Sequence, residues 1–149
     1  DHYKSQRELV NLLVNIVAKG GNMALNVSPQ PDGRIPVEAW ESLRGLGAWM
    51  QTYGEAIYGT RICAPYQSGN LAFTQKGDTV YAIRLYPEEG EAVEEKLLIP
   101  YQGKIRGISM VDTKKEAEWK MTEEGIQVVI PQEYREGETP IAIVWKIEQ

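Results

Sequence analysis

Residues 23–27 constrain the fold of this 149-residue chain more than any other segment. Their letters, MALNV, are apolar on both sides of an extended chain, which is typical of a strand covered on both faces of a parallel sheet. Such a strand needs a hydrogen-bonded neighbour on each edge. No second strand pattern occurs in residues 1–60. We therefore expect its neighbours to belong to a larger parent protein; the alternative is an unusual pairing with the second half of the chain.

A helix is predicted on each side of this strand. Ser5 followed by Glu8 fits a capping box, in which each side chain bonds an end amide of the helix. An apolar stripe follows at three- and four-residue steps, and Lys19 before Gly20 and Gly21 predicts the end of the helix. The residues of the stripe are Leu9, Leu12, Leu13, Ile16 and Val17, with Val10 and Val14 broadening it.

The second helix is predicted from Pro36 to about Tyr53, after a turn over residues 28–33 that is rich in proline and ends in Asp-Gly. Its buried stripe is expected to consist of Ala39, Leu43, Leu46 and Met50, and Gly54 is expected to end it. Helix, buried strand and helix together are a portion of an α/β architecture.

Residues 61–149 change to a period of two, which indicates strands. Six or seven short strands with turns between them favour an antiparallel β-sandwich. The predicted fold is therefore mostly β: a C-terminal antiparallel β-sandwich over residues 61–149, preceded by a helix-strand-helix portion over residues 1–60.

Composition excludes several classes of function. The net charge of -5 disfavours nucleic acid as a partner, and no apolar run is long enough to span a membrane. Cys63 is the only cysteine and His2 the only histidine, so we expect a buried thiol, no metal site and no cofactor. The chain begins with Asp1 rather than Met, so its start gives little information on targeting.

The first half resembles the end of the catalytic barrel of α-L-fucosidases, glycoside hydrolase family 29. The words that carry the resemblance are LVNLLVNIVAKGGNMALNVSPQPDGRIP and LGAWMQTYGEAIYGTR, and DHYKS resembles the family segment before them. FTQKGDTVYAI and the closing strands resemble the family's C-terminal β-sandwich less specifically. The resemblance implies that residues 1–60 are the terminal part of a (β/α) barrel. It also implies a retaining exo-glycosidase that removes terminal α-L-fucose, with its aspartate nucleophile on an earlier strand outside this chain.

We therefore expect no catalytic residue in this chain. Mapping onto the barrel places Asn26 at the active-site end of the final strand, and His2 and Tyr3 in the preceding loop on the same side. These three are the candidates for substrate binding, at the rim of the pocket or as supports for their neighbours. Asp32 is interpreted as a turn residue and Glu55 as a hydrogen-bonding or capping residue. We expect the acidic cluster Glu88, Glu89, Glu91, Glu94 and Glu95 to be solvated, and Trp40, Trp49, Trp119 and Trp145 to lie in the core.

The leading hypothesis is a C-terminal portion of an α-L-fucosidase, inactive and structural by itself. Its partner is the missing barrel portion of the same parent, whose substrate is a fucosylated glycan. One alternative is a noncatalytic carbohydrate-binding module, which predicts exposed aromatic side chains on one sheet face or loop cluster. Another is an interaction domain, whose apolar helix faces predict self-association. The resemblance favours a periplasmic, extracellular or lysosomal setting over the cytoplasm.

Overall fold

The computed structural model describes residues 3–21 and 33–149 of the chain. The expected strand at residues 23–27 lies outside the described residues. The helical elements are α1 (Gln6–Ala18), α2 (Val37–Tyr53), the 3₁₀ turn η1 (Gly54–Ala56) and α3 (Gln132–Arg135). The strands are β1 (Arg61–Ser68), β2 (Leu71–Lys76), β3 (Thr79–Leu85), β4 (Lys96–Ile99), β5 (Gly107–Met110), β6 (Glu118–Thr122), β7 (Gly125–Val129) and β8 (Ala142–Glu148).

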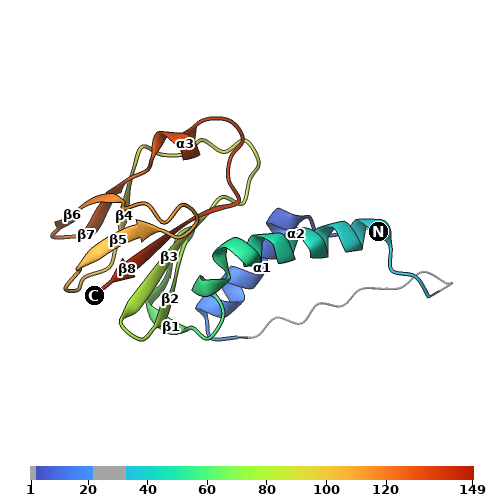
Figure 1. The fold of residues 1–149 in the computed structure, drawn as a ribbon, viewed down its shortest axis with the longest axis horizontal. Helices are drawn as coiled ribbons and strands as arrows, with labels where there is room; N and C mark the ends of the chain where they lie inside the picture. The colour runs from blue at the N-terminus through green and yellow to red at the C-terminus, as the bar shows by residue number, and fades with distance from the viewer. Residues whose placement is uncertain (1–2, 22–32) are drawn as a thin grey trace.

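The strands form two antiparallel sheets that pack face to face, so the predicted mostly-β class with an antiparallel sandwich is confirmed. One sheet has five strands in the order β1-β2-β3-β8-β5, and the other has three in the order β4-β7-β6. Helices α1 and α2 lie on the outer side of the five-stranded sheet, and the three-stranded sheet lies on its inner side (Figure 1). The described chain is thus a sandwich with one face covered by helices.

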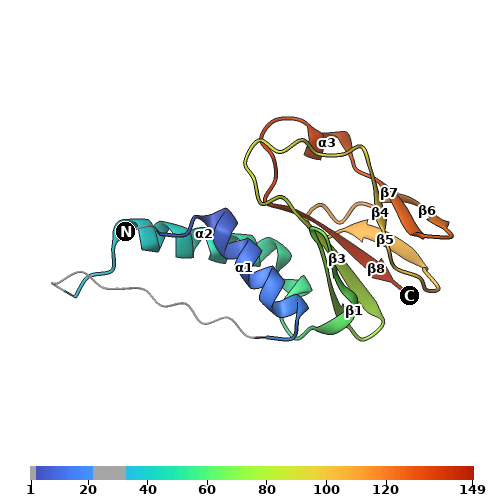
Figure 2. The ribbon, with the colours of Figure 1, turned by 180° about the vertical axis from the view of Figure 1, so that it is seen from behind.

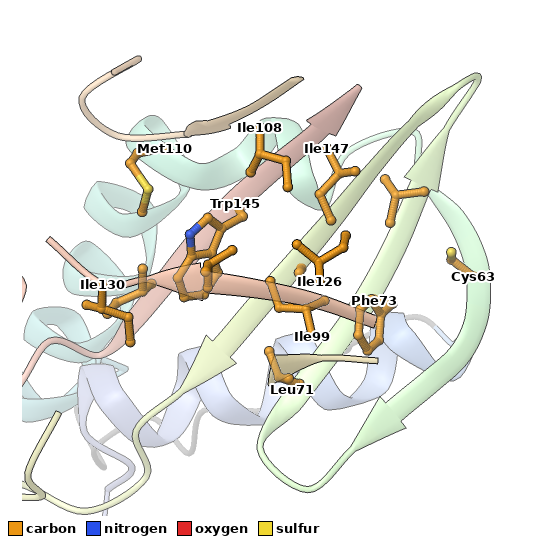
Figure 3. Close-up of a cluster of buried hydrophobic side chains, with 14 of the residues drawn as sticks. Cys63, Leu71, Phe73, Ile99, Ile108, Met110, Ile126, Ile130, Trp145 and Ile147 are labelled. Carbon is orange, nitrogen blue, oxygen red and sulfur yellow. The ribbon is translucent and has the colours of Figure 1, made fainter. Parts of the chain in front are cut away.

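The sandwich core fills the space between the two sheets. Alternate residues of β8, Ile143, Trp145 and Ile147, point into it, as the period of two predicts. They meet Ile126 and Val128 from β7 of the other sheet. Figure 3 shows Trp145 at the centre of this cluster and Cys63 at its margin, both buried. The expectation that Cys63 and Trp145 are core residues is confirmed.

A second core lies between the helices and the other face of the same five-stranded sheet (Figure 2). From β3 it takes Tyr81, Ile83 and Leu85, which alternate with the residues that face the sandwich core. From α1 it takes Val10 and Val14, which are fully buried. Because both faces of this sheet are covered, its central strands are apolar on both sides.

The ends of both long helices follow the local signals in the sequence. Ser5 and Glu8 form the predicted capping box at the start of α1, with both bonds at 3.2 Å. Gly54 caps α2 as predicted. The two helices approach closely where Gly45 meets Gln6, since a Cβ on Gly45 would lie 2.9 Å from the Gln6 Cβ. Glycine is required there because any side chain would push the helices apart.

Two predictions about these elements were wrong. The sandwich has eight strands in the described residues rather than six or seven, because β1 was not recognised. Its pairing with β2 shifts register between Ile62 and Gln67, so its side chains do not alternate evenly. The stripe expected on α2 is also only partly buried: Ala39 is buried and Leu43 is not.

Candidate functional site

The structure describes one of the three predicted substrate-binding residues. Tyr3 is half-buried and precedes Ser5, the residue that caps α1. His2 and Asn26 lie outside the described residues, as does Asp32. The role of Tyr3, His2 and Asn26 in sugar binding stays a prediction.

Glu55 lies where the helical segment meets the five-stranded sheet. The Tyr81 hydroxyl on β3 donates a hydrogen bond to a Glu55 carboxylate oxygen at 2.8 Å. The ammonium groups of Lys114 and Lys146 lie 3.2 and 3.4 Å from its carboxylate oxygens. Lys76 donates to the Glu55 backbone carbonyl at 3.2 Å. Four residues of the sandwich segment therefore hold this one residue at the end of α2.

Asp112 forms a second polar contact between helix and sandwich. The Tyr134 hydroxyl donates to one oxygen of its carboxylate at 2.6 Å, and the Tyr53 hydroxyl at the end of α2 lies 3.5 Å from the other. Tyr53 also packs against Trp49, with 5.0 Å between the ring centres. Asp112 thus links the end of α2 to the segment that contains α3.

Arg7 holds the other end of the helical layer. Its guanidinium donates to the backbone carbonyls of Tyr86, Pro140 and Thr139, the last two at 3.1 and 2.8 Å. Neither Arg7 nor Asp112 was singled out by the sequence analysis. The available signal was electrostatic: a cation in the first turn is unfavourable to the helix dipole, which makes Arg7 unusual at this position.

The pKa shifts of Glu55 and Tyr53 suit a role in holding the helices to the sandwich rather than a role in acid catalysis. Burial raises the pKa of Glu55, but the hydrogen bonds from Tyr81 and Lys114 and the charge of Lys146 outweigh it and lower the pKa below its usual value. A glycosidase general acid needs a raised pKa. Burial, together with the charge of Asp112 and its hydrogen bond, raises the pKa of Tyr53 to about 12. The hydrogen-bonding role predicted for Glu55 is confirmed.

The acidic cluster is less solvated than predicted. Arg84 lies 3.4 Å from Glu91 and 3.1 Å from Glu94, its guanidinium covers the Tyr86 ring, and the Tyr86 hydroxyl donates to Glu94. Burial raises the pKa of Glu94, but these bonds and the charge of Arg84 lower it overall. Across residues 3–21 and 33–149, no group of acidic, histidine and cysteine side chains could hold a metal ion.

Among the described residues, the exposed aromatic side chains are Trp40, Tyr58 and Tyr66. Trp40 is 49% exposed on α2, so its predicted core position was wrong, and Trp119 is only half-buried. Tyr58 and Tyr66, also exposed, lie near the start of β1 and within it. The outer face of the three-stranded sheet carries Lys96, Leu98, Glu118, Lys120, Gln127 and Val129.

No described helix is long and apolar enough to cross a membrane.

Comparison with known proteins gives consistent similarities over the whole chain. The α-L-fucosidase family model matches residues 1–55, and the model of the α-L-fucosidase C-terminal domain matches residues 65–148. An α-L-fucosidase of Branchiostoma floridae is 33% identical over 137 residues, which cover 87% of this chain and 29% of that protein. The tissue α-L-fucosidase of Rattus norvegicus is 30% identical over 148 residues, covering 96% of this chain and 31% of that protein.

Solved structures agree with these relatives. The α-fucosidase of Thermotoga maritima in complex with a mechanism-based inhibitor superimposes with a TM-score of 0.82 at 30% identity. The match covers 99% of this chain and 35% of that one. The same enzyme in complex with fucose gives a TM-score of 0.80 at 31% identity. The chain thus spans about a third of the length of the proteins that it matches.

Proposed function

The chain belongs to the α-L-fucosidase family and carries its C-terminal domain, and on that premise we propose that it is the C-terminal part of a larger α-L-fucosidase. In this proposal, residues 1–60 complete a (β/α) barrel supplied by the rest of the parent protein, and residues 61–149 brace it. The two family matches, to residues 1–55 and 65–148, support this division.

The observation that carries the proposal is that α1 is apolar on two opposite sides. Val10, Val14 and Ala18 are fully buried on one side, against the five-stranded sheet. Leu12 and Ile16 lie roughly half a turn away around the helix and are half-buried, and they belong to neither of the two cores that the described residues form. A helix that is apolar on both sides is normally covered on both sides.

Helix α2 and the turn after it also carry apolar side chains outside both cores. Trp40 is exposed, and Leu43 is half-buried outside both cores. Tyr58 is 64% exposed and lines two adjoining hollows of about 590 and 370 Å³. We call the set Leu12, Ile16, Trp40, Leu43, Gly47 and Tyr58 the open apolar surface. The barrel is its proposed occupant, since the matched relatives are about three times longer than this chain.

The parent enzyme in this proposal removes terminal α-L-fucose from glycans with retention of configuration. A carboxylate nucleophile on an earlier barrel strand, outside this chain, attacks the anomeric carbon as the glycosidic bond breaks, and water then hydrolyses the glycosyl-enzyme ester. In this proposal the chain supports the barrel, and Asn26, His2 and Tyr3 either contact the sugar at the rim of the fucose pocket or support the residues that do. The contacts of Glu55, Asp112 and Arg7 fix the helices that carry those segments.

The test compares this chain with the longer protein from its own coding sequence, using an aryl α-L-fucoside as substrate. The longer protein is expected to turn over at ordinary enzyme rates, about 1 to 1,000 per second, and the 149-residue chain is expected to show no turnover. Turnover by the isolated chain at such rates would contradict the proposal, because it would place the catalytic pair within these residues.

A further inference from the structure

Two long connections meet at the end of the sandwich where α3 lies (Figure 1). Residues 86–95 join β3 to β4, and residues 130–141 join β7 to β8. Connections in compact domains have a median of about 4–6 residues, so both of these are longer than usual. The cavity between them measures about 490 Å³, within the range of small-molecule sites. This loop pocket is lined by Arg7, residues 89–93, Tyr134, Arg135 and residues 137–139.

Hydrogen bonds between residues of the chain hold the walls of the loop pocket in place. Arg7 binds the carbonyls of Pro140 and Thr139 on one wall and that of Tyr86 on the other. The Thr139 hydroxyl donates to the Glu91 carbonyl across the cavity at 2.6 Å. The Tyr134 side chain is held by its bond to Asp112. A site whose walls are already ordered loses little conformational entropy when a ligand binds.

The groups left over at the mouth of the loop pocket define its chemistry. Glu89 and Glu138 are exposed and bond to no side chain within the part of the chain that the structure describes. Arg135 is exposed, and its Nε donates to the Ile130 carbonyl at 3.2 Å. Carboxylates accept bonds from hydroxyl groups, and a guanidinium donates to adjacent oxygens. Ala92 and Val93 add an apolar patch.

A neutral sugar fits this mixture better than an ion does. An anion would face two carboxylates, and a cation would face the Arg135 guanidinium. Sugar hydroxyls both donate and accept hydrogen bonds, so one ring can use both kinds of group. Its C–H face can rest on the apolar patch of the wall.

The position of the loop pocket agrees with this chemistry. Arg7 lies in the first turn of α1, just after Tyr3. In a (β/α) barrel, the N-terminal end of a helix follows the carboxyl end of a strand, on the side where active sites form. We propose that the loop pocket binds the neutral hexose units to which the terminal fucose is attached. This choice of ligand rests on the proposed function.

The experiment is an NMR titration of the 149-residue chain with lactose, with fucosyl-lactose and with free fucose. Lactose and fucosyl-lactose are expected to give saturable shifts confined to residues 89–93 and 134–139, and fucose alone is expected to give none. Arg135→Ala and Glu138→Gln should each weaken binding by about tenfold or more. Glu124→Gln, an exposed glutamate on the β6–β7 turn, is the matched control and should leave binding unchanged.

No saturable shift with lactose, an equal response to free fucose, or shifts that survive both substitutions would each overturn the loop-pocket inference. Because the titration needs no catalytic barrel, its result is separate from the fucosidase assay. If the longer protein hydrolyses the fucoside but lactose causes no NMR shifts, only the proposal of sugar binding in the loop pocket is rejected. A lactose response without turnover by the longer protein would reject the proposed function alone.

Discussion

The Tyr81 hydroxyl donates to the Glu55 carboxylate at 2.8 Å, and this bond joins the end of the helical layer to the middle of the five-stranded sheet. Glu55→Gln keeps the shape of the side chain but removes the charge that Lys114 and Lys146 also contact. We expect the free energy of unfolding at pH 7 to fall by about 1 kcal/mol, since partial exposure screens these charges. Glu41→Gln on the exposed side of α2 should change it little.

The pH dependence of that difference follows from the lowered pKa of Glu55. A carboxyl with a lowered folded-state pKa stabilises the fold above its unfolded value of about 4.5, and the stabilisation is lost as the pH falls through the folded value. The difference between the native protein and Glu55→Gln should therefore be full at pH 6–7 and shrink below about pH 4.5. Urea denaturation of both proteins across this range measures it. A difference that grows as the pH falls would contradict this assignment.

Arg7→Ala should destabilise the isolated chain because it leaves three carbonyl acceptors without their donor. We expect a loss of about 2–3 kcal/mol in the free energy of unfolding, measured by chemical denaturation. Arg7→Lys should recover only part of it, since an ammonium is a single point and lacks the planar fork of a guanidinium. Arg44→Ala, on the exposed face of α2, is the control. Equal effects of Arg7→Ala and Arg44→Ala would refute the role given to Arg7.

A substitution at Gly47 is expected to have opposite effects on the stability of the isolated chain and of the longer protein. A Cβ at this position in α2 would meet no atom within 4 Å in the described structure, yet glycine inside a helix costs about 1 kcal/mol relative to alanine. Gly47→Ala should therefore stabilise the isolated chain by about 0.5–1 kcal/mol and destabilise the longer protein, where the barrel approaches this surface. Thermal unfolding of both proteins provides the comparison.

Gly45→Ala is the matched substitution in the same helix. It should destabilise both proteins, because its Cβ would collide with Gln6 of α1 in either case. Stabilisation of the longer protein by Gly47→Ala would show that nothing approaches α2 at that position.

The open apolar surface should make the isolated chain self-associate. Sedimentation velocity is expected to show dimers or larger species that increase with protein concentration. Leu12→Glu should shift the chain toward monomer, whereas Thr52→Glu, with the same change of charge on an exposed position of α2 outside both hollows, should not. A chain that stays monomeric at all concentrations would contradict this prediction.

Local signals in the sequence predicted several elements well. The spacing of Ser5 and Glu8 predicted the start of α1, and Gly54 predicted the end of α2. Alternation predicted the inward positions of Trp145 and its neighbours on β8. Each of these features depends on residues within a few positions of one another, so a single sequence is enough to predict it.

Features that depend on distant contacts were missed. β1 was not predicted because its register shift interrupts the alternation of inward and outward side chains. The prediction of a core position for Trp40 is wrong because the fold leaves this side chain of α2 exposed. Glu91 and Glu94 were expected in solvent, and only the fold brings Arg84 beside them. For the candidate site, Glu55 was recognised as a hydrogen-bonding residue, but its partners Lys114 and Lys146 lie far along the chain.

The most direct test of the central claim is the reactivity of a thiol placed on the outer side of α1. Leu12→Cys and Val14→Cys would be made in a Cys63→Ser background, in this chain and in the longer protein. The Val14→Cys thiol should be protected in both, because Val14 is fully buried against the sheet. At concentrations low enough for the isolated chain to be monomeric, its Leu12→Cys thiol should react at least about tenfold faster than the same thiol in the longer protein. Equal rates in the two proteins would show that no barrel covers this face, and would contradict the account.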